Sequence, residues 1–204
     1  MRGRFVAFEG MDGSGKSTQL RAVADRLREL GIDVVTTREP GGTPMAEEFR
    51  SVLLTLRDEA VSPITEILAM FAAREQHLNN VIRPALAAGK WVLSDRFVAS
   101  SFSYQVRARG VSEDLYNSLV RHVVADTMPD VTLIFNMSDE EAANRLGLRT
   151  EKADRLDLEE RAFHQKVNAA LRELVGKPGY REIDAGRTKD AITEEIISIL
   201  TQCD

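Results

Sequence analysis

The chain has 204 residues, of which 43% are hydrophobic and 29% charged, and its formal net charge is −5. This length supports one good core rather than two domains, and the negative charge argues against a nucleic-acid partner, because proteins that bind duplexes are usually basic. No apolar run is long enough to span a membrane and the N-terminus has no signal-peptide pattern. The single cysteine, Cys203, cannot form an internal disulfide, so we expect a cytoplasmic protein.

Short apolar runs alternate along the chain with longer segments of helical periodicity. Strands are predicted at residues 5–8, 32–37, 91–93, 131–135 and 180–183, and helices at about 20–30, 45–56, 64–88, 112–125, 138–146, 158–175 and 189–200. Strands separated by helices pair in parallel and are buried on both faces. We therefore predict one α/β domain over residues 1–204, with a three-layer fold and a five-stranded parallel sheet flanked by helices. Ligands in such folds bind beyond the carboxyl ends of the strands.

The strongest motif is GMDGSGKS at residues 10–17, which fits the phosphate-loop (P-loop) pattern G-x-x-x-x-G-K-[ST] between a predicted strand and a predicted helix. Its glycines let backbone N–H groups turn toward phosphate oxygens, and the helix adds the positive end of its dipole. Lys16 should reach the β- and γ-phosphates, and the Ser17 hydroxyl should bind Mg²⁺. The motif predicts a P-loop NTPase fold that binds ATP with magnesium and transfers its terminal phosphoryl group. The predicted ATP-binding residues are Gly10, Met11, Asp12, Gly13, Ser14, Gly15, Lys16, Ser17 and Thr18.

A second carboxylate, Asp95, ends the apolar strand at residues 91–93 and is predicted to hold Mg²⁺ together with Ser17. Arg96 follows it directly, which places a cation at the edge of the sheet that carries the phosphate loop. Residues 136–139 read NMSD and lack the lysine of the guanine-recognition signature Asn-Lys-x-Asp, which argues against a GTPase.

Arginine recurs along the same edge of the predicted sheet. Arg38 follows the second strand, and Arg74 lies one helical turn after Phe71. A small phosphorylated acceptor needs such guanidinium groups, because its phosphate is repelled by ATP and is held by paired hydrogen bonds. The alternative is that Arg38 and Arg74 are solvated surface charges.

The segments EGMDGSGKST, TREPGGT, FAAREQH, SDRF and SSFSYQ occur in this order, and with them the chain resembles bacterial thymidylate kinase, a P-loop nucleoside monophosphate kinase, over essentially its whole length. The resemblance implies an enzyme, an ATP-dependent dTMP kinase. Its reaction would convert thymidine 5′-monophosphate to the diphosphate with ATP and Mg²⁺, for dTTP synthesis. It also implies a homodimer packed through helices.

The resemblance further implies roles for single residues. Asp12 would take the 3′-hydroxyl of the deoxyribose, and Glu39 would organise the magnesium and acceptor side. Phe71 would stack on thymine, although its neighbour Met70 is the alternative, and Tyr104 would crowd the 2′ position and reject ribonucleotides. Arg38 and Arg96 would bind the acceptor phosphate. Arg50 and Arg74 would lie at the carbonyl edge of the base. Ser101 and Gln105 would recognise the base. The predicted substrate-binding residues are Asp12, Arg38, Glu39, Arg50, Phe71, Arg74, Arg96, Ser101, Tyr104 and Gln105.

The charged stretch at about residues 145–157 is predicted to form a mobile lid. The phosphate loop itself has no arginine, so the resemblance implies that a lid arginine reaches the ATP phosphates. Arg149 or Arg145 could do so, and Arg155 matches the family pattern better. The predicted catalytic residues are Lys16, Asp95, Arg96, Arg149 and Arg155.

Two other functions remain open at this point. A kinase for another nucleoside monophosphate or a deoxynucleoside would share the phosphate loop and the Asp95–Arg96 pair but not the residues set around thymine. A regulatory or assembly protein would hydrolyse ATP slowly and would need a large partner surface. The three histidines, His77, His122 and His164, lie on predicted helices and are expected to serve packing rather than catalysis.

Overall fold

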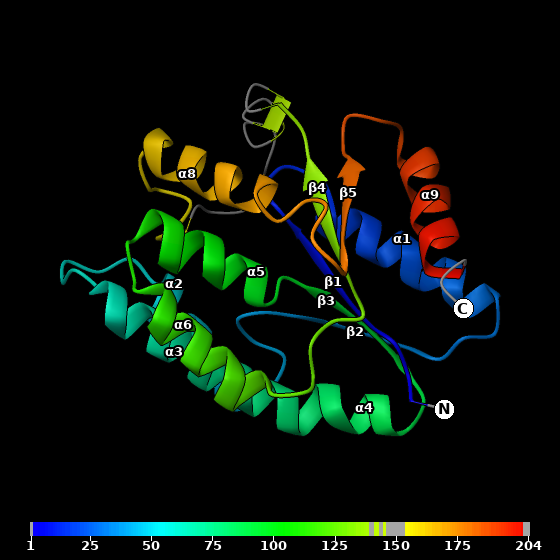
Figure 1. The fold of residues 1–204 in the computed structure, drawn as a ribbon, viewed down its shortest axis with the longest axis horizontal. Helices are drawn as coiled ribbons and strands as arrows, with labels where there is room; N and C mark the ends of the chain where they lie inside the picture. Colours follow the sequence, from blue (N-terminus) through cyan, green and yellow to red (C-terminus); the bar gives the residue numbers. More distant parts are fainter. Residues whose placement is uncertain (1, 139–140, 143–144, 146–153, 202–204) are drawn as a thin grey trace.

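The computed structural model describes residues 2–138, 141–142, 145 and 154–201. Its centre is one parallel sheet with the strand order β2-β3-β1-β4-β5. The five strands are β1 (Phe5–Gly10), β2 (Val34–Arg38), β3 (Trp91–Asp95), β4 (Val131–Asn136) and β5 (Tyr180–Asp184). Helices cover both faces (Figure 1), so the prediction of a three-layer α/β fold with five parallel strands is confirmed.

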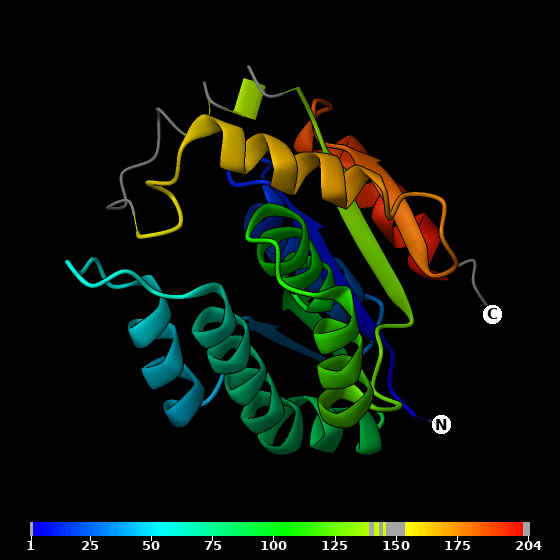
Figure 2. The ribbon, with the colours of Figure 1, turned by 60° about the vertical axis from the view of Figure 1, so that its left-hand side comes forward.

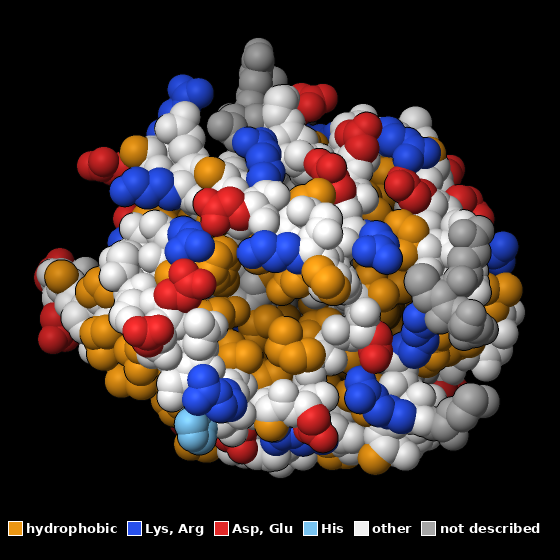
Figure 3. All heavy atoms as spheres, in the orientation of Figure 1, with side chains coloured by type: hydrophobic (Ala, Val, Ile, Leu, Met, Phe, Trp, Pro, Cys, Tyr) orange, Lys and Arg blue, Asp and Glu red, His pale blue; other side chains and the backbone are white. Residues whose placement is uncertain are grey.

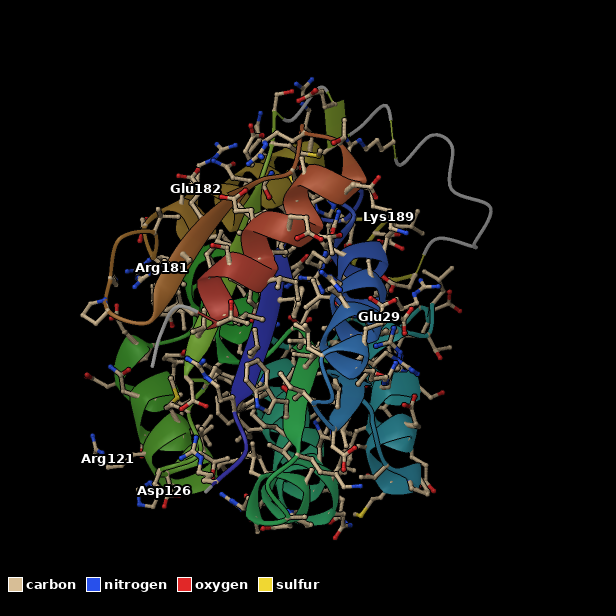
Figure 4. The ribbon with its side chains drawn as sticks, turned by 90° about the vertical axis from the view of Figure 1, so that its right-hand side faces the viewer. Glu29, Arg121, Asp126, Arg181, Glu182 and Lys189 are labelled. Carbon is tan, nitrogen blue, oxygen red and sulfur yellow. The ribbon has the colours of Figure 1, made fainter. Side chains whose placement is uncertain are left out.

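One face of the sheet is covered by α1 (Lys16–Glu29) and α9 (Lys189–Thr201), which lie side by side in Figure 4. Lys189 is labelled there at the start of α9, and its carbonyl accepts a 3.0 Å hydrogen bond from the side chain of Gln19. Val6 and Phe8 point from β1 into this layer, because alternate residues of a strand face opposite sides.

The other face carries more helices: α2 (Pro44–Leu54), α3 (Pro63–His77), α4 (Arg83–Ala87), α5 (Val98–Ser101), α6 (Glu113–Leu119) and α8 (Arg161–Arg172). Of these, α4, α5 and α8 contact the strands most closely, and buried side chains of α3 join the same core cluster as those of β1. In Figure 2, α8 lies in the upper part of the molecule, and α2 and α3 lie in the lower part. The side chains of Phe5 and Ala7 enter this layer from β1.

Several helices differ from the sequence prediction. The stretch predicted as one helix at 64–88 is α3, a π-helical segment η1 (Leu78–Ile82) and α4, and the helix at 112–125 is α6 followed by η3 (Val120–Val124). The helix predicted to begin at residue 158 begins at Arg161. The helix predicted at 138–146 lies mostly outside the described residues, although the Ser138 hydroxyl accepts a 3.2 Å hydrogen bond from the backbone N–H of Glu141, as its capping box requires.

One helical segment was not predicted at all. It consists of α5 and η2 (Phe102–Ala108), directly after β3. Residues 97–106 are all buried, so the segment lacks the polar stripe that reveals a surface helix in a sequence. This omission matters because the segment carries Ser101, Tyr104 and Gln105.

The exposed surface has no strongly basic character on the face drawn in Figure 3, where lysine and arginine are interspersed with aspartate and glutamate around an apolar area. Among the described residues, no helix is both long enough and apolar enough to cross a membrane.

The N-terminus of α2 provides a test of the fold. Thr43 is buried, and its hydroxyl caps the helix by accepting a 3.2 Å hydrogen bond from the N–H of Ala46. Thr43→Ala should lower the free energy of unfolding by about 1 kcal/mol, as measured by urea denaturation followed by circular dichroism. Thr43→Ser keeps the capping oxygen and should remain close to wild type, and equal losses in both variants would contradict the capping role.

Candidate functional site

The phosphate loop connects β1 to α1 and has the backbone geometry that its glycines were expected to permit. Gly10 has φ 148°, and a Cβ there would lie 2.7 Å from the carbonyl oxygen of Phe135. Gly15 has φ 84° and stands at the N-terminus of α1, where free N–H groups and the helix dipole attract anions. The hydroxyl of Ser14 is buried and has no hydrogen-bond partner among the described residues. An unpaired donor in this position suits a phosphate oxygen.

Lys16 is almost fully buried beside the loop. Its ammonium donates a 2.9 Å hydrogen bond to the carbonyl of Met11 and lies 3.6 Å from Oδ1 of Asp12. Burial, followed by the nearby charge of Arg96, lowers the pKa of Lys16, while Asp12 and Asp95 oppose that shift. An anionic ligand would therefore stabilise the charged form of this side chain.

The two predicted magnesium ligands, Ser17 and Asp95, contact each other directly, because the Ser17 hydroxyl donates to Oδ2 of Asp95. Both supply the hard oxygen donors that Mg²⁺ prefers. The described residues contain no group of three or more acidic, histidine or cysteine side chains that could by itself hold a metal ion. Mg²⁺ at phosphoryl-transfer sites needs only one or two protein ligands besides phosphate oxygens and water, so the pair fits the ion.

Arg96 links the loop to the rest of the site. It has φ 71°, an uncommon backbone conformation for a residue other than glycine. Its guanidinium donates to Oδ1 of Asp12 at 2.8 Å and to the Ser100 hydroxyl at 3.1 Å. Burial alone would lower the pKa of Arg96, but the acidic groups around it, Tyr104 and Asp12 first, raise that pKa well above its usual range. Arg96 is a fixed positive charge.

Glu9 is a supporting residue that sequence reasoning missed. It is fully buried at the end of β1, on the same face as Phe5 and Ala7. Its carboxylate accepts hydrogen bonds from the N–H of Phe97 at 2.7 Å and from the N–H and hydroxyl of Ser100 at 3.1 and 2.6 Å. Burial raises the pKa of Glu9 despite Arg96 and these donors. A charged residue inside an apolar strand is the signal that could have revealed it.

A cavity opens next to the phosphate loop, between α2, α3 and the segment formed by α5 and η2. Six predicted substrate-binding residues line it: Asp12, Glu39, Arg50, Arg96, Tyr104 and Gln105. Seven further residues line the cavity, and of these only Met70 was expected there, as an alternative to Phe71: Pro40, Leu54, Met70, Ser100, Asp154, Leu156 and Asp157.

Four other predicted residues do not line the cavity. Arg38 is exposed and forms a 2.8 Å ion pair with Glu47. Phe71 is 2% exposed and packs edge-on against Tyr116 within the core, whereas its neighbour Met70 lines the cavity. Ser101 is buried and accepts a hydrogen bond from Arg74, which lies behind the wall.

Arg74 belongs to a buried network that fixes Glu39. Nε of Arg74 donates to Oε2 of Glu39 at 2.7 Å, and Nδ1 of His77 lies 3.0 Å from Oε1 of the same carboxylate. His77 is thus buried, as a packing role predicts, and it also holds Glu39 in place. Nη1 of Arg74 is buried without a partner in the described part of the chain. That N–H group can donate to a ligand atom.

The arginines expected to act from the lid have different surroundings. Arg149 lies outside the described residues, and Arg145 is exposed. Arg155 donates to Oε2 of Glu66 on α3 and, at 2.7 Å, to the carbonyl of Leu53 on α2. The contacts of Arg155 are therefore with helices beside the cavity rather than with the phosphate loop.

Comparison with known proteins gives one consistent family. The thymidylate kinase family matches residues 8–196. The chain is 43% identical over 198 residues to a thymidylate kinase of Marinomonas sp. (strain MWYL1), covering 96% of this chain and 93% of that protein. It is 46% identical over 202 residues to a thymidylate kinase of Pseudomonas fluorescens (strain Pf0-1), covering 98% and 96%.

The likeness extends to the fold. A crystal structure of thymidylate kinase from Ehrlichia chaffeensis superposes with a TM-score of 0.79 at 29% sequence identity, covering 98% of this chain and 100% of that one. The similarity therefore spans the whole domain and is not confined to the phosphate loop.

The raised pKa of Glu9 predicts a pH-dependent difference between wild type and Glu9→Gln. When the pKa of a carboxyl group is higher in the folded than in the unfolded state, its contribution to the free energy of unfolding falls as the pH rises. The fall begins near the ordinary pKa of the group and continues through its pKa in the folded state. The free energy of unfolding of Glu9→Gln, relative to wild type, should therefore increase from about pH 5 to pH 8. Urea denaturation at both pH values measures it. The exposed Glu29→Gln is the control and should show no such trend, and a relative stability of Glu9→Gln that falls with pH would refute the expectation.

Proposed function

The chain belongs to the thymidylate kinase family, and we propose that it phosphorylates thymidine 5′-monophosphate in the cavity beside its phosphate loop. It is an ATP-dependent kinase, and its product is the diphosphate required for dTTP synthesis. The observation that carries the proposal is that Asp12 and Arg96 belong to both halves of the site. They are ion-paired at 2.8 Å next to Lys16, and both line the cavity. A donor phosphate on the loop and an acceptor in the cavity would therefore meet at these two side chains.

The polar atoms around the cavity suit the edge of a thymine base. Oε1 of Gln105 and Nη1 of Arg74 are buried, and neither has a partner among the described residues. Gln105 would accept from the ring N–H of thymine, and Arg74 would donate to a carbonyl oxygen or lie close behind it, with Arg50 on the α2 side. Met70 would provide the apolar contact with the base.

Other residues would contact the sugar and the phosphate of the acceptor. Asp12 would accept the 3′-hydroxyl, and Tyr104, whose ring lies 5.4 Å from the Arg96 guanidinium, would crowd the 2′ position. Arg96 would bind the acceptor phosphate, and Arg38 would join it by leaving its exposed partner Glu47. Glu39, fixed by Arg74 and His77, would order the acceptor side. Ser101 would act through Arg74 rather than on the base.

Transfer itself needs alignment and charge neutralisation more than covalent chemistry, because the acceptor phosphate oxygen is already ionised. Lys16 and Arg96 would stabilise the charge that develops on the transferred group. Ser17 and Asp95 would hold Mg²⁺, which when bound would neutralise negative charge on the phosphates of ATP. We assign the lid contribution to Arg149 rather than Arg155, since Arg155 is paired with Glu66.

We further propose that the protein is a cytoplasmic homodimer. Apolar side chains on α2 and at the start of α3 support an interface there, because they are about half exposed: Met45, Val52, Ile64 and Leu68. Covering such a patch with a second copy would remove apolar surface from water.

The function is tested by measuring ADP release with ATP and magnesium in the presence of each nucleoside monophosphate in turn. Release with thymidine monophosphate should exceed that with the other acceptors, and omission of magnesium should abolish it. Equal, slow release with every acceptor and with none would mean that the protein is an ATPase, and the assignment of the cavity would be wrong.

The placement of Met70 and Phe71 gives a paired prediction. Met70→Ala removes an apolar contact with the base and should raise the KM for thymidine monophosphate about fivefold or more, with a smaller effect on kcat. Phe71→Ala should instead lower the free energy of unfolding by about 3–5 kcal/mol, because it opens a cavity in the core. Steady-state kinetics and urea denaturation of both variants separate the two roles. The opposite pattern, a stable Phe71→Ala with a raised KM, would contradict them.

A further inference from the structure

Gln105 is held in one orientation by a residue outside the cavity. Nε2 of its amide donates a 2.8 Å hydrogen bond to Oε1 of Glu66. The other end of the amide, Oε1, is buried and unpaired in the part of the chain that the structure describes. Gln105 therefore has its carbonyl oxygen, rather than its NH₂ group, available to a ligand.

Glu66 enforces this orientation because of its chemistry. It lies on α3, is 1% exposed, and also accepts from Arg155 and from Nε of Arg109 at 3.5 Å. A carboxylate paired with two guanidinium groups has oxygen acceptors and no donor. If the Gln105 amide turned over, its oxygen would face the Glu66 oxygens and its NH₂ group would lose its acceptor. That arrangement leaves buried polar atoms unsatisfied and is disfavoured.

The charges around Glu66 balance. Arg109 also pairs with Glu159, so two arginines meet two glutamates at this point. Arg155 comes from the segment that follows residues 146–153, and its backbone N–H donates a 3.0 Å hydrogen bond to the carbonyl of Leu54. Glu66 on α3 thus contacts two other parts of the chain, residues 105–109 and Arg155.

We propose that Glu66 is a positioning residue that determines base selectivity by keeping the Gln105 carbonyl turned toward the substrate. The proposal rests on the proposed function and adds to it. A base that presents a ring N–H to Gln105, as thymine does, gains a hydrogen bond. A cytosine-type base presents an unprotonated ring nitrogen at the same place, so two acceptors would face each other.

The test compares thymidine monophosphate with 5-methyl-deoxycytidine monophosphate, which has the same methyl group and differs only at the base edge. The quantity measured is the ratio of kcat/KM for the two acceptors. In Glu66→Gln the side chain at position 66 can donate as well as accept, so the Gln105 amide can turn over. We expect the ratio to fall at least about tenfold relative to wild type.

Two controls separate selectivity from general damage. Glu66→Asp keeps an acceptor-only side chain and should lower kcat/KM for both acceptors while retaining the preference within about threefold. Arg109→Gln disturbs the same network but keeps the Glu66 carboxylate, and it should also retain the ratio. If Glu66→Gln is too unstable for turnover, the ratio is measured as dissociation constants of the two acceptors at low temperature.

The outcomes are distinct. An unchanged ratio in Glu66→Gln, or equal losses of selectivity in all three variants, would overturn the positioning role. Failure of the wild-type protein to prefer thymidine monophosphate over other acceptors would instead refute the proposed function.

Discussion

The site depends on the buried carboxylate of Glu9. It stands on the central strand β1, and it binds two backbone N–H groups and one hydroxyl of residues 97–100. These contacts lie at the start of the α5 and η2 segment, which two residues, Arg96 and Phe97, connect to β3, and Arg96 has the positive φ of 71°. Placing an ionisable group in the core costs free energy, which its donors offset only in this geometry. The Glu9 carboxylate thus orients Arg96 and the helical segment that carries Tyr104 and Gln105.

Paired opposite charges recur through the rest of the site. Asp12 pairs with Arg96, Glu39 with Arg74, and Glu66 with Arg155. Buried or half-buried ion pairs add little net stability, because the cost of desolvating both groups offsets their attraction. Their effect here is geometric. Arg96 lines the cavity and is held at a fixed position by Asp12, so this guanidinium would need little reorganisation to receive an anionic ligand.

Helix α3 shows how one element serves several of these contacts. Glu66, Met70 and Arg74 are spaced four residues apart and lie on one face of the helix, toward the cavity and the residues behind it, and His77 follows one turn later. Phe71 is rotated away from Met70 and belongs to the core with Ile67 and Leu78. The same helix therefore lines the cavity with one face and packs into the hydrophobic core with another.

The sequence alone predicted the parallel sheet, the phosphate loop, and the Ser17–Asp95 and Arg96 positions, because these depend on local spacing and on strand ends that share one edge of the sheet. It did not predict the segment at residues 98–108, because residues 98–106 are buried throughout and show no alternation of buried and exposed faces. It did not predict the contacts of Glu9 either, because hydrogen-bond partners 88 and 91 residues away leave no local pattern. Met70 and Phe71 lie four and three residues before Arg74, and both spacings place a side chain on the Arg74 face of a helix. Only the packing of α3 against Tyr116 on one side and against the cavity on the other decided between them, because rotation of a helix about its axis is set by its neighbours.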